Sequence, residues 1–150
     1  MPATDTPPIL ESGETLIAEI RPDRGRYWRD HGIMAVALMA LAGGVLWATG
    51  TPYPAIGSLG AILAVGVRAA YLASETLGLR WRLTDRRVIL PGGQRSVPLL
   101  DLKTARVFFG DVQLITQSGD KHLLKHVAGG PALVEKILKA RDRRAKRRAN

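Results

Sequence analysis

Two long uncharged stretches stand out from the mixed pattern of polar and apolar residues. The first covers residues 32–50, nineteen positions without a charged side chain. At helical rise it is about 28 Å long, close to the hydrocarbon thickness of a bilayer. The second begins at Tyr53 and is uncharged up to Arg68. The pattern predicts a membrane-spanning helical hairpin, with helices over about 31–50 and 53–74.

Beyond Leu79 the pattern changes to short β-type runs separated by turn-forming residues. The runs are LRWRLT, RVIL, RSVPLL, ARVFF, VQLITQ and KHLLKHV. Such spacing predicts six strands of an antiparallel sheet or barrel. A final helix is expected after them, because Gly130 suits a cap, Pro131 suits the first helical position, and an apolar stripe follows. The predicted domain covers 79–140, and a polybasic tail covers 141–150.

A seventh strand is a candidate in the segment that precedes the hairpin. Residues 1–30 form this N-terminal segment, and the part at 14–20, within ETLIAEIR, is compatible with a β-strand. It lies on the same side of the bilayer as the later strands. The segment is therefore expected to pair with their sheet.

The basic residues predict the orientation of the hairpin. Four precede the first span, none lies in the link Thr51-Pro52, and seventeen follow Arg68; the four are Arg21, Arg24, Arg26 and Arg29. By the positive-inside rule both termini are cytoplasmic. Arg68 lies about 9 Å from the inner end of its span, within snorkelling reach of the headgroups. A buried charge in a transport path is the alternative, but neither span supplies an acidic partner.

Small residues recur at helical spacing in both spans. They are Ala40, Gly44 and Ala48 in the first, and Gly57, Gly60, Ala61 and Ala64 in the second. Small side chains let helix backbones approach closely. These positions are expected to pack the two helices together or to receive a partner's helix.

Several of these segments together resemble a known family. WRLTDRRVIL at 81–90 is similar to a recurring segment of bacterial membrane proteins with a PH-like domain. The order around it is similar too: GETLIAEIRPDR before a transmembrane pair, then SVPLLDLKTARV, GDVQLITQSGD and a helix. The resemblance implies a bent antiparallel sheet of six or seven strands with a C-terminal helix, the hairpin inserted within the strand order, and a place in the bacterial inner membrane. It does not imply a ligand.

Catalytic and metal chemistry find little support in the sequence. There is no cysteine, no P-loop and no Rossmann glycine pattern. His122 and His126 are four apart on a predicted strand, about 13 Å, which is too far to share a zinc ion. Asp85, Asp111 and Asp120 fall at predicted turns, where aspartate bonds nearby backbone amides. We therefore expect a non-enzymatic protein without a metal or cofactor.

Basic residues are the main candidates for binding. Eight of the thirteen residues from Lys136 to Arg148 are basic. The candidates for contact with lipid or a partner are Arg141, Arg143, Arg144, Arg147 and Arg148, followed by Arg86 and Arg87. Such a cluster is typical of a solvated or protein-facing helix end, of a surface for anionic lipid, or of a nucleic-acid contact. Because the domain is tethered at a membrane, contact with anionic lipid has geometric priority, and nucleic acid is the least favoured of the three.

The sequence thus predicts a membrane-anchored binding or scaffold module that contacts protein partners or lipid headgroups. The alternative is an assembly factor or accessory subunit of a larger membrane complex, bound through its helices. A homo-oligomer is compatible with either.

Overall fold

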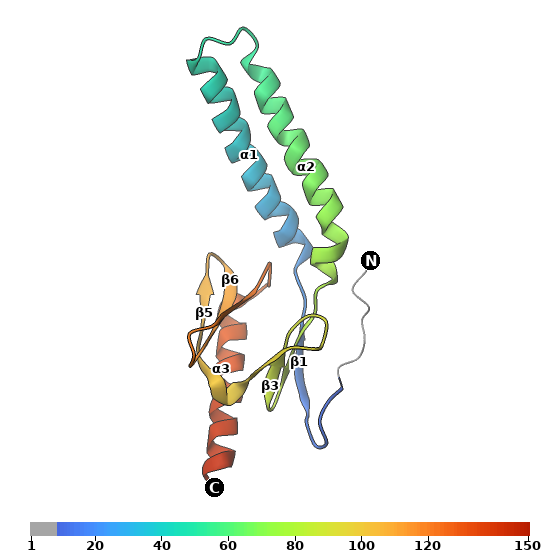
Figure 1. Ribbon diagram of the computed structural model, residues 1–150, viewed down its shortest axis with the longest axis vertical. Helices are drawn as coiled ribbons and strands as arrows, with labels where there is room; N and C mark the ends of the chain where they lie inside the picture. Colours follow the sequence, from blue (N-terminus) through green and yellow to red (C-terminus); the bar gives the residue numbers. More distant parts are fainter. Residues whose placement is uncertain (1–8) are drawn as a thin grey trace. The chain divides into compact units, whose positions relative to one another are not determined.

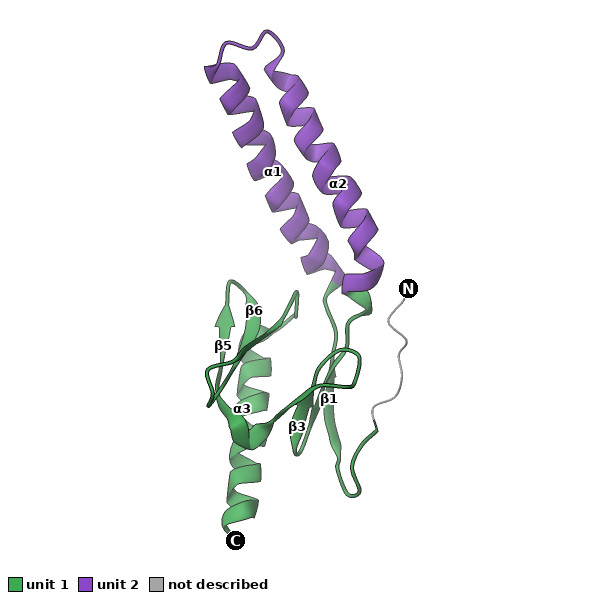
Figure 2. Cartoon of the chain, in the orientation of Figure 1, with its two compact units in different colours: residues 1–23, 77–150 green, residues 24–76 purple. Residues whose placement is uncertain are grey.

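A computed structural model describes residues 9–150 of the chain (Figure 1). The chain forms two compact units (Figure 2). One consists of residues 24–76 and is the helical hairpin. The other combines residues 9–23 with residues 77–150, and we name it the β unit.

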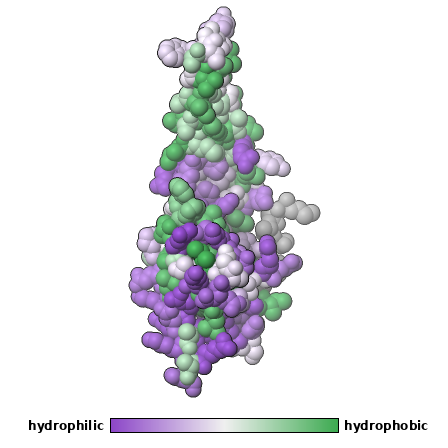
Figure 3. All heavy atoms as spheres, turned by 60° about the vertical axis from the view of Figure 1, so that its left-hand side comes forward, coloured by the Kyte–Doolittle hydropathy of each residue, from purple (hydrophilic) through white to green (hydrophobic). Residues whose placement is uncertain are grey.

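The hairpin contains helices α1 (Arg24–Ala48) and α2 (Pro54–Gly78). Each has 25 residues, about 37 Å at helical rise, and is long and apolar enough to cross a membrane. None of the apolar window of α1 is buried within the described residues, and 11% of that of α2 is. Figure 3 shows this apolar surface. Both helices extend beyond the uncharged runs into polar sequence.

Two glycines let the helices pack closely. A Cβ atom added at Gly43 would lie 2.4 Å from the Ser58 hydroxyl oxygen, and one added at Gly57 would overlap the Leu46 side chain. The Ser58 hydroxyl donates a hydrogen bond of 3.1 Å to the backbone oxygen of Met39. Small residues therefore let the two helices approach closely.

The interface uses only some of the small residues predicted from spacing. Gly57 and Ala61 are half-buried. The others are exposed on the outside of the hairpin: Ala40, Gly44, Ala48, Gly60 and Ala64. Gly43 and Gly44 are adjacent in the sequence but lie on different faces of α1. The spacing of small residues predicted a contact at Gly44, whereas the contact with α2 uses Gly43.

One aromatic side chain lies in the contact between the two helices. Tyr27 is 1% exposed, and its hydroxyl donates a 2.8 Å hydrogen bond to the backbone oxygen of Ala69. It joins the bases of the two helices. Trp47 and Tyr71, in contrast, are exposed at 77% and 82%.

The β unit consists of seven strands and two helical segments. They are β1 (Leu16–Ile20), β2 (Trp81–Thr84), β3 (Arg87–Ile89), β4 (Ser96–Pro98), the 3₁₀ turn η1 (Leu99–Asp101), β5 (Leu102–Phe108), β6 (Asp111–Thr116), β7 (Lys121–Leu124) and helix α3 (Gly130–Ala149). The segment before the hairpin forms β1 and pairs antiparallel with β2. The basic tail continues α3 as one helix.

The strands form two antiparallel sheets, β1-β2-β3-β4 and β5-β6-β7, and the expectation of one bent sheet is wrong. Pairing stops between β4 and β5 because Pro98 lacks an amide donor and η1 turns the chain. At the other corner an isolated bridge, Pro22 to Val127, takes the place of a ladder between β1 and β7.

A single core joins the two sheets and α3. Its most buried members, all 0% exposed, include Leu83 from β2, Leu99 from η1, Leu114 from β6 and Ile137 from α3. The apolar stripe of α3 ends at Ala140, which is 5% exposed. The first half of α3 is therefore part of the core, and the second half extends past it.

The hairpin is inserted between two neighbouring strands. Ile20, the last residue of β1, is paired with Trp81, the first of β2. Only residues 21–23 and 79–80 connect this strand pair to α1 and α2. Both helices therefore leave the β unit at one end of the β1–β2 pair, which we name the helix-proximal end; the opposite end, at the β2–β3 turn, is the distal end.

Two adjacent glycines provide a test of the helix contact. We expect Gly43→Val to separate the helices, because its side chain overlaps Ser58, and Gly44→Val to leave them unchanged, because no atom lies within 4 Å of its added Cβ. Spin labels at Val45→Cys and Leu59→Cys, both exposed, would report the interhelical distance. Equal broadening of the distance distribution by both substitutions would contradict the packing.

Candidate binding surfaces of the β unit

A buried carboxylate ties the N-terminal segment to the β2–β3 turn. Glu14, whose side chain is 0% exposed, accepts two hydrogen bonds of 3.0 Å from the guanidinium of Arg87. The Thr84 hydroxyl donates a third bond of 2.7 Å, and the Glu11 backbone nitrogen donates a fourth of 2.8 Å. Four donors thus satisfy a charge that would be costly to bury alone.

The electrostatics of this network favour the ionised pair. Burial by itself raises the pKa of Glu14, but the hydrogen bonds from Arg87, Thr84 and Glu11 outweigh it, so the pKa lies below its usual value. The hydrogen bond to Glu14 in turn raises the pKa of Arg87. The network is therefore fully charged at neutral pH.

The neighbouring turn residues bind the same segment. Arg86 donates hydrogen bonds of 3.1 Å to the Glu11 carboxylate and 3.0 Å to the backbone oxygen of Ser12. Asp85 accepts a 2.9 Å bond from the Thr15 amide. Arg86 and Arg87, candidates for lipid contact from the sequence, are thus engaged by carboxylates of the chain itself. The TDRR sequence at 84–87 acts as a latch that holds the N-terminal segment beside β2.

The tail arginines lie along the second half of α3. Arg141 donates a 2.8 Å hydrogen bond to the backbone oxygen of Lys103 and pairs with Asp142. Arg147 lies 3.6 Å from the Asp85 carboxylate. Arg144 is half-buried, and Arg143 and Arg148 are exposed. This half of α3 has no apolar face left for a bilayer, so any lipid contact there is electrostatic.

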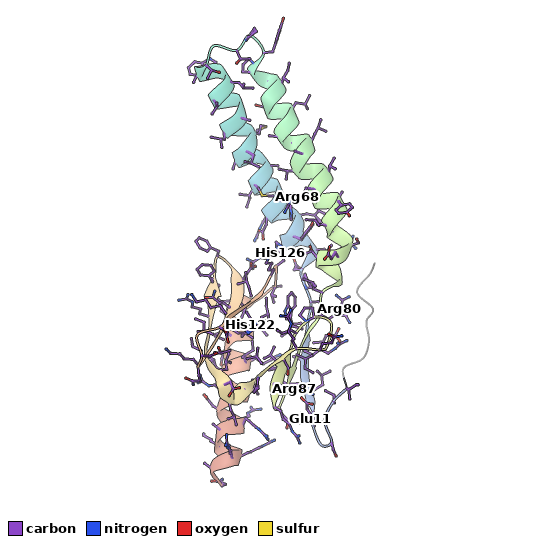
Figure 4. The ribbon with its side chains drawn as sticks, in the orientation of Figure 1. Glu11, Arg68, Arg80, Arg87, His122 and His126 are labelled. Carbon is purple, nitrogen blue, oxygen red and sulfur yellow. The ribbon has the colours of Figure 1, made fainter. Side chains whose placement is uncertain are left out.

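These basic groups gather at the distal end of the β unit. Asp85 belongs to the turn after β2, and its contact with Arg147 places the end of α3 there. The latch arginines belong to the same turn. Figure 4 shows Glu11 and Arg87 at this end and His126 at the other. The sequence-predicted binding residues are therefore separated, within the β unit, from the connections to α1 and α2.

A groove runs between the edge strand β1 and α3. One part has a volume of about 360 Å³ and is lined by residues 18–21, at the end of β1, by residues 127–129 and by the start of α3. A second part, also of about 360 Å³, is lined by Ile17 and by α3 as far as Arg143. Ala132 and Lys136 line both parts, so the groove is continuous. β1 has a strand partner on one side only, which leaves its other edge along the groove.

Basic side chains form one wall of the groove. They are Lys136, Lys139 and Arg143, spaced three and four residues apart on one face of α3. Glu135 lines the same part of the groove and forms an ion pair of 2.6 Å with Lys139, so the wall keeps a net positive charge. Of the three basic residues, only Arg143 was selected from the sequence. The helical spacing of the two lysines was visible there, but their role depends on β1, which the hairpin separates from α3 in the sequence.

The remaining polar candidates have local roles. His122 lies in β7, whereas His126 follows the strand with a left-handed φ of 55°. Asp111 accepts a 2.8 Å hydrogen bond from the amide of His126, fifteen residues away, and Asp120 accepts a 2.7 Å bond from the Ser118 hydroxyl. These bonds are local to the β unit, but they are not the bonds to adjacent backbone amides that the sequence predicts. Within residues 9–150, no three His, Asp or Glu side chains gather as metal ligands would.

Comparisons with models of protein families, with curated proteins and with solved structures gave no match. The function must therefore be argued from the two units themselves.

The latch can be tested through its pH dependence. Because the pKa of Glu14 is lowered in the folded state, its stabilisation is fully present above the unfolded pKa of about 4.3 and is lost as the pH falls through the folded value. We expect Glu14→Gln to destabilise the β unit by about 2 kcal/mol at pH 7 and to reduce this acid-dependent loss. The measurement is thermal unfolding of the full chain in mild detergent, followed by near-UV circular dichroism.

Glu11→Gln is the matched control. Its side chain is 58% exposed, so we expect a loss below about 1 kcal/mol. Equal effects of the two substitutions would show that the buried pair does not fix the N-terminal segment.

Proposed function

We propose that this protein is a non-enzymatic, membrane-anchored binding module with a PH-like β unit. In this proposal α1 and α2 cross a bacterial inner membrane, and both termini are cytoplasmic. Two long apolar helices support the anchoring, and the arginines that flank the spans support the orientation. A four-stranded and a three-stranded antiparallel sheet with a C-terminal helix, together with the WRLTDRRVIL segment, support the PH-like assignment.

The groove between β1 and α3 is the observation that carries the binding function. An extended peptide can add to an open strand edge through main-chain hydrogen bonds. From Ala132 to Arg143 the groove follows α3 for about 17 Å, the length of about five extended residues. The net positive charge of this wall, three basic groups against Glu135, favours acidic side chains on that peptide. The proposed ligand is therefore an extended, acidic segment of a partner protein.

The position of the tail arginines favours a protein as their binding partner, rather than the lipid headgroups of the membrane that the helices would span. Arg147 is bound at the distal end of the β unit, and both connections to the spans are at the other end. Arg148 extends the positive charge beyond the groove. In this proposal these arginines steer an acidic partner toward the groove, because exposed charges act mainly on the rate of association.

Charge variants of equal size test this proposal. We expect Lys136→Gln, Lys139→Gln and Arg143→Gln together to reduce recovery of a co-purifying protein at least about tenfold, because they remove the basic wall. The control is Arg95→Gln, Lys121→Gln and Lys146→Gln, which removes the same three charges at exposed sites outside the groove. The measurement is quantitative pull-down of the full chain in mild detergent.

The outcomes separate the candidate partners. Equal losses for both triple variants would contradict the groove and assign binding to overall charge. Binding of the unsubstituted chain to nanodiscs that increases with anionic lipid and falls equally in both variants would favour lipid. Ribonuclease-sensitive recovery would favour nucleic acid.

A role as an accessory subunit of a membrane complex is the second candidate. It is favoured by the small residues on the outside of the hairpin, where Gly44 and Gly60 have no atom within 4 Å of an added Cβ. Another helix can approach closely at such positions.

This second candidate makes a separate prediction. Gly44→Leu with Gly60→Leu should abolish co-purification of an integral membrane partner and leave the groove-dependent partner bound, since the added side chains fill only the outer faces. The control pair, Val36→Leu with Val67→Leu, enlarges two side chains that are already exposed. Unchanged co-purification in the glycine variant would exclude the outer faces as a contact.

A further inference from the structure

The turn between β5 and β6 exposes two phenylalanines. Phe108 is paired with Asp111, so the turn itself is Phe109–Gly110. Phe109 is 92% exposed and Phe108 is 41% exposed, and their rings meet edge to face at 4.7 Å. Because exposed large apolar groups that gather at one point mark interaction sites, this turn is a candidate contact surface.

The backbone of this turn does not favour phenylalanine. Phe109 and Gly110 have φ values of 48° and 82°, the left-handed values of a type I′ turn. Asparagine or glycine fits the first position best, and a bulky side chain there is an outlier. Neither local geometry nor core packing explains Phe109, which directs the explanation to an external contact.

A chain of hydrogen bonds places the turn at the helix-proximal end. Asp111, which follows the turn, accepts a 2.8 Å bond from the amide of His126. The backbone oxygen of His126 accepts a 2.7 Å bond from the amide of Asp23. Asp23 directly precedes α1. Figure 2 shows the β5–β6 turn at the same end of the β unit as these connections.

Cationic side chains accompany the two rings. The Arg106 guanidinium lies 5.6 Å from the centre of the Phe108 ring, and its Nε donates to the side chain of Gln113. Lys125 is exposed at the end of β7, one residue before His126. Aromatic rings beside basic groups suit the boundary between acyl chains and phosphates in a bilayer.

We propose that Phe108 and Phe109 insert into the headgroup boundary of the membrane that α1 and α2 span. This inference rests on the membrane anchoring in the proposed function. The spans and the turn would then hold the β unit at separate points, which fixes its tilt. The groove and the distal basic end would remain available to a partner.

Site-specific labels on the full chain test the insertion. The protein has no cysteine, so Phe109→Cys can carry a single bimane label. In liposomes of phosphatidylcholine and phosphatidylglycerol, we expect lipids with shallow nitroxides to quench it. Gln117→Cys, in the turn at the opposite end of β6, is the matched control and should stay unquenched. Leu41→Cys, within α1, should be quenched by deep nitroxides.

The labels distinguish failure of the insertion from failure of the anchoring. Quenching at Leu41 with equal, weak quenching at Phe109 and Gln117 would overturn the insertion and leave the anchoring intact. Absence of quenching at Leu41 would overturn both. A label at Phe109 shielded from aqueous iodide but not reached by lipid nitroxides would show a protein contact, such as a second copy, and would also overturn the proposal.

A substitution that suits the turn keeps the test independent of folding. Phe109→Asn fits the left-handed φ, so the β unit should become more stable. We expect this variant to lower the quenching of a label at Lys125→Cys by at least about twofold, because the inserted ring is lost. Greater stability with unchanged quenching at Lys125 would show that the ring does not hold the β unit to the bilayer.

Discussion

The pairing of β1 with β2 is the constraint on which the rest of the structure depends. These neighbouring strands are separated in the chain by the whole helical hairpin. Closing such a long loop costs conformational entropy, which the strand pair must recover. The Glu14–Arg87 pair supplies charge-assisted hydrogen bonds beyond the end of β1, and Ile20 and Trp81 supply buried apolar area at its other end. Without this pairing the groove would lose its strand edge.

The two ends of the β unit carry different sets of charged and aromatic side chains. At the helix-proximal end Glu19 is paired with arginines from both connections, Arg21 and Arg80, and the aromatic β5–β6 turn lies nearby. At the distal end the latch neutralises Arg86 and Arg87, and the end of α3 carries the remaining positive charge. One arginine-rich sequence therefore serves two purposes. Paired arginines maintain the fold, and exposed ones are available for recognition.

Much of the fold could be predicted from local patterns. The uncharged runs predicted both helices, although α1 begins seven residues earlier and α2 ends four residues later than predicted, because the helices continue into charged sequence. Gly and Pro turns separated the strands that follow. The division into two sheets could not be predicted, because it depends on where pairing stops at Pro98 and Pro22. For the site, spacing identified the arginines but not their partners. Arg87 and Glu14 are far apart in sequence, and so are the two sides of the groove.

Hydrogen exchange of the full chain in lipid nanodiscs tests the central claim most directly. The account predicts that the β1 amides facing β2, within Leu16–Ile20, are protected to the same extent as those of Trp81–Thr84, because the two strands form one unit across the hairpin. Rapid exchange throughout Leu16–Ile20, with protection retained in β5 and β6, would contradict it.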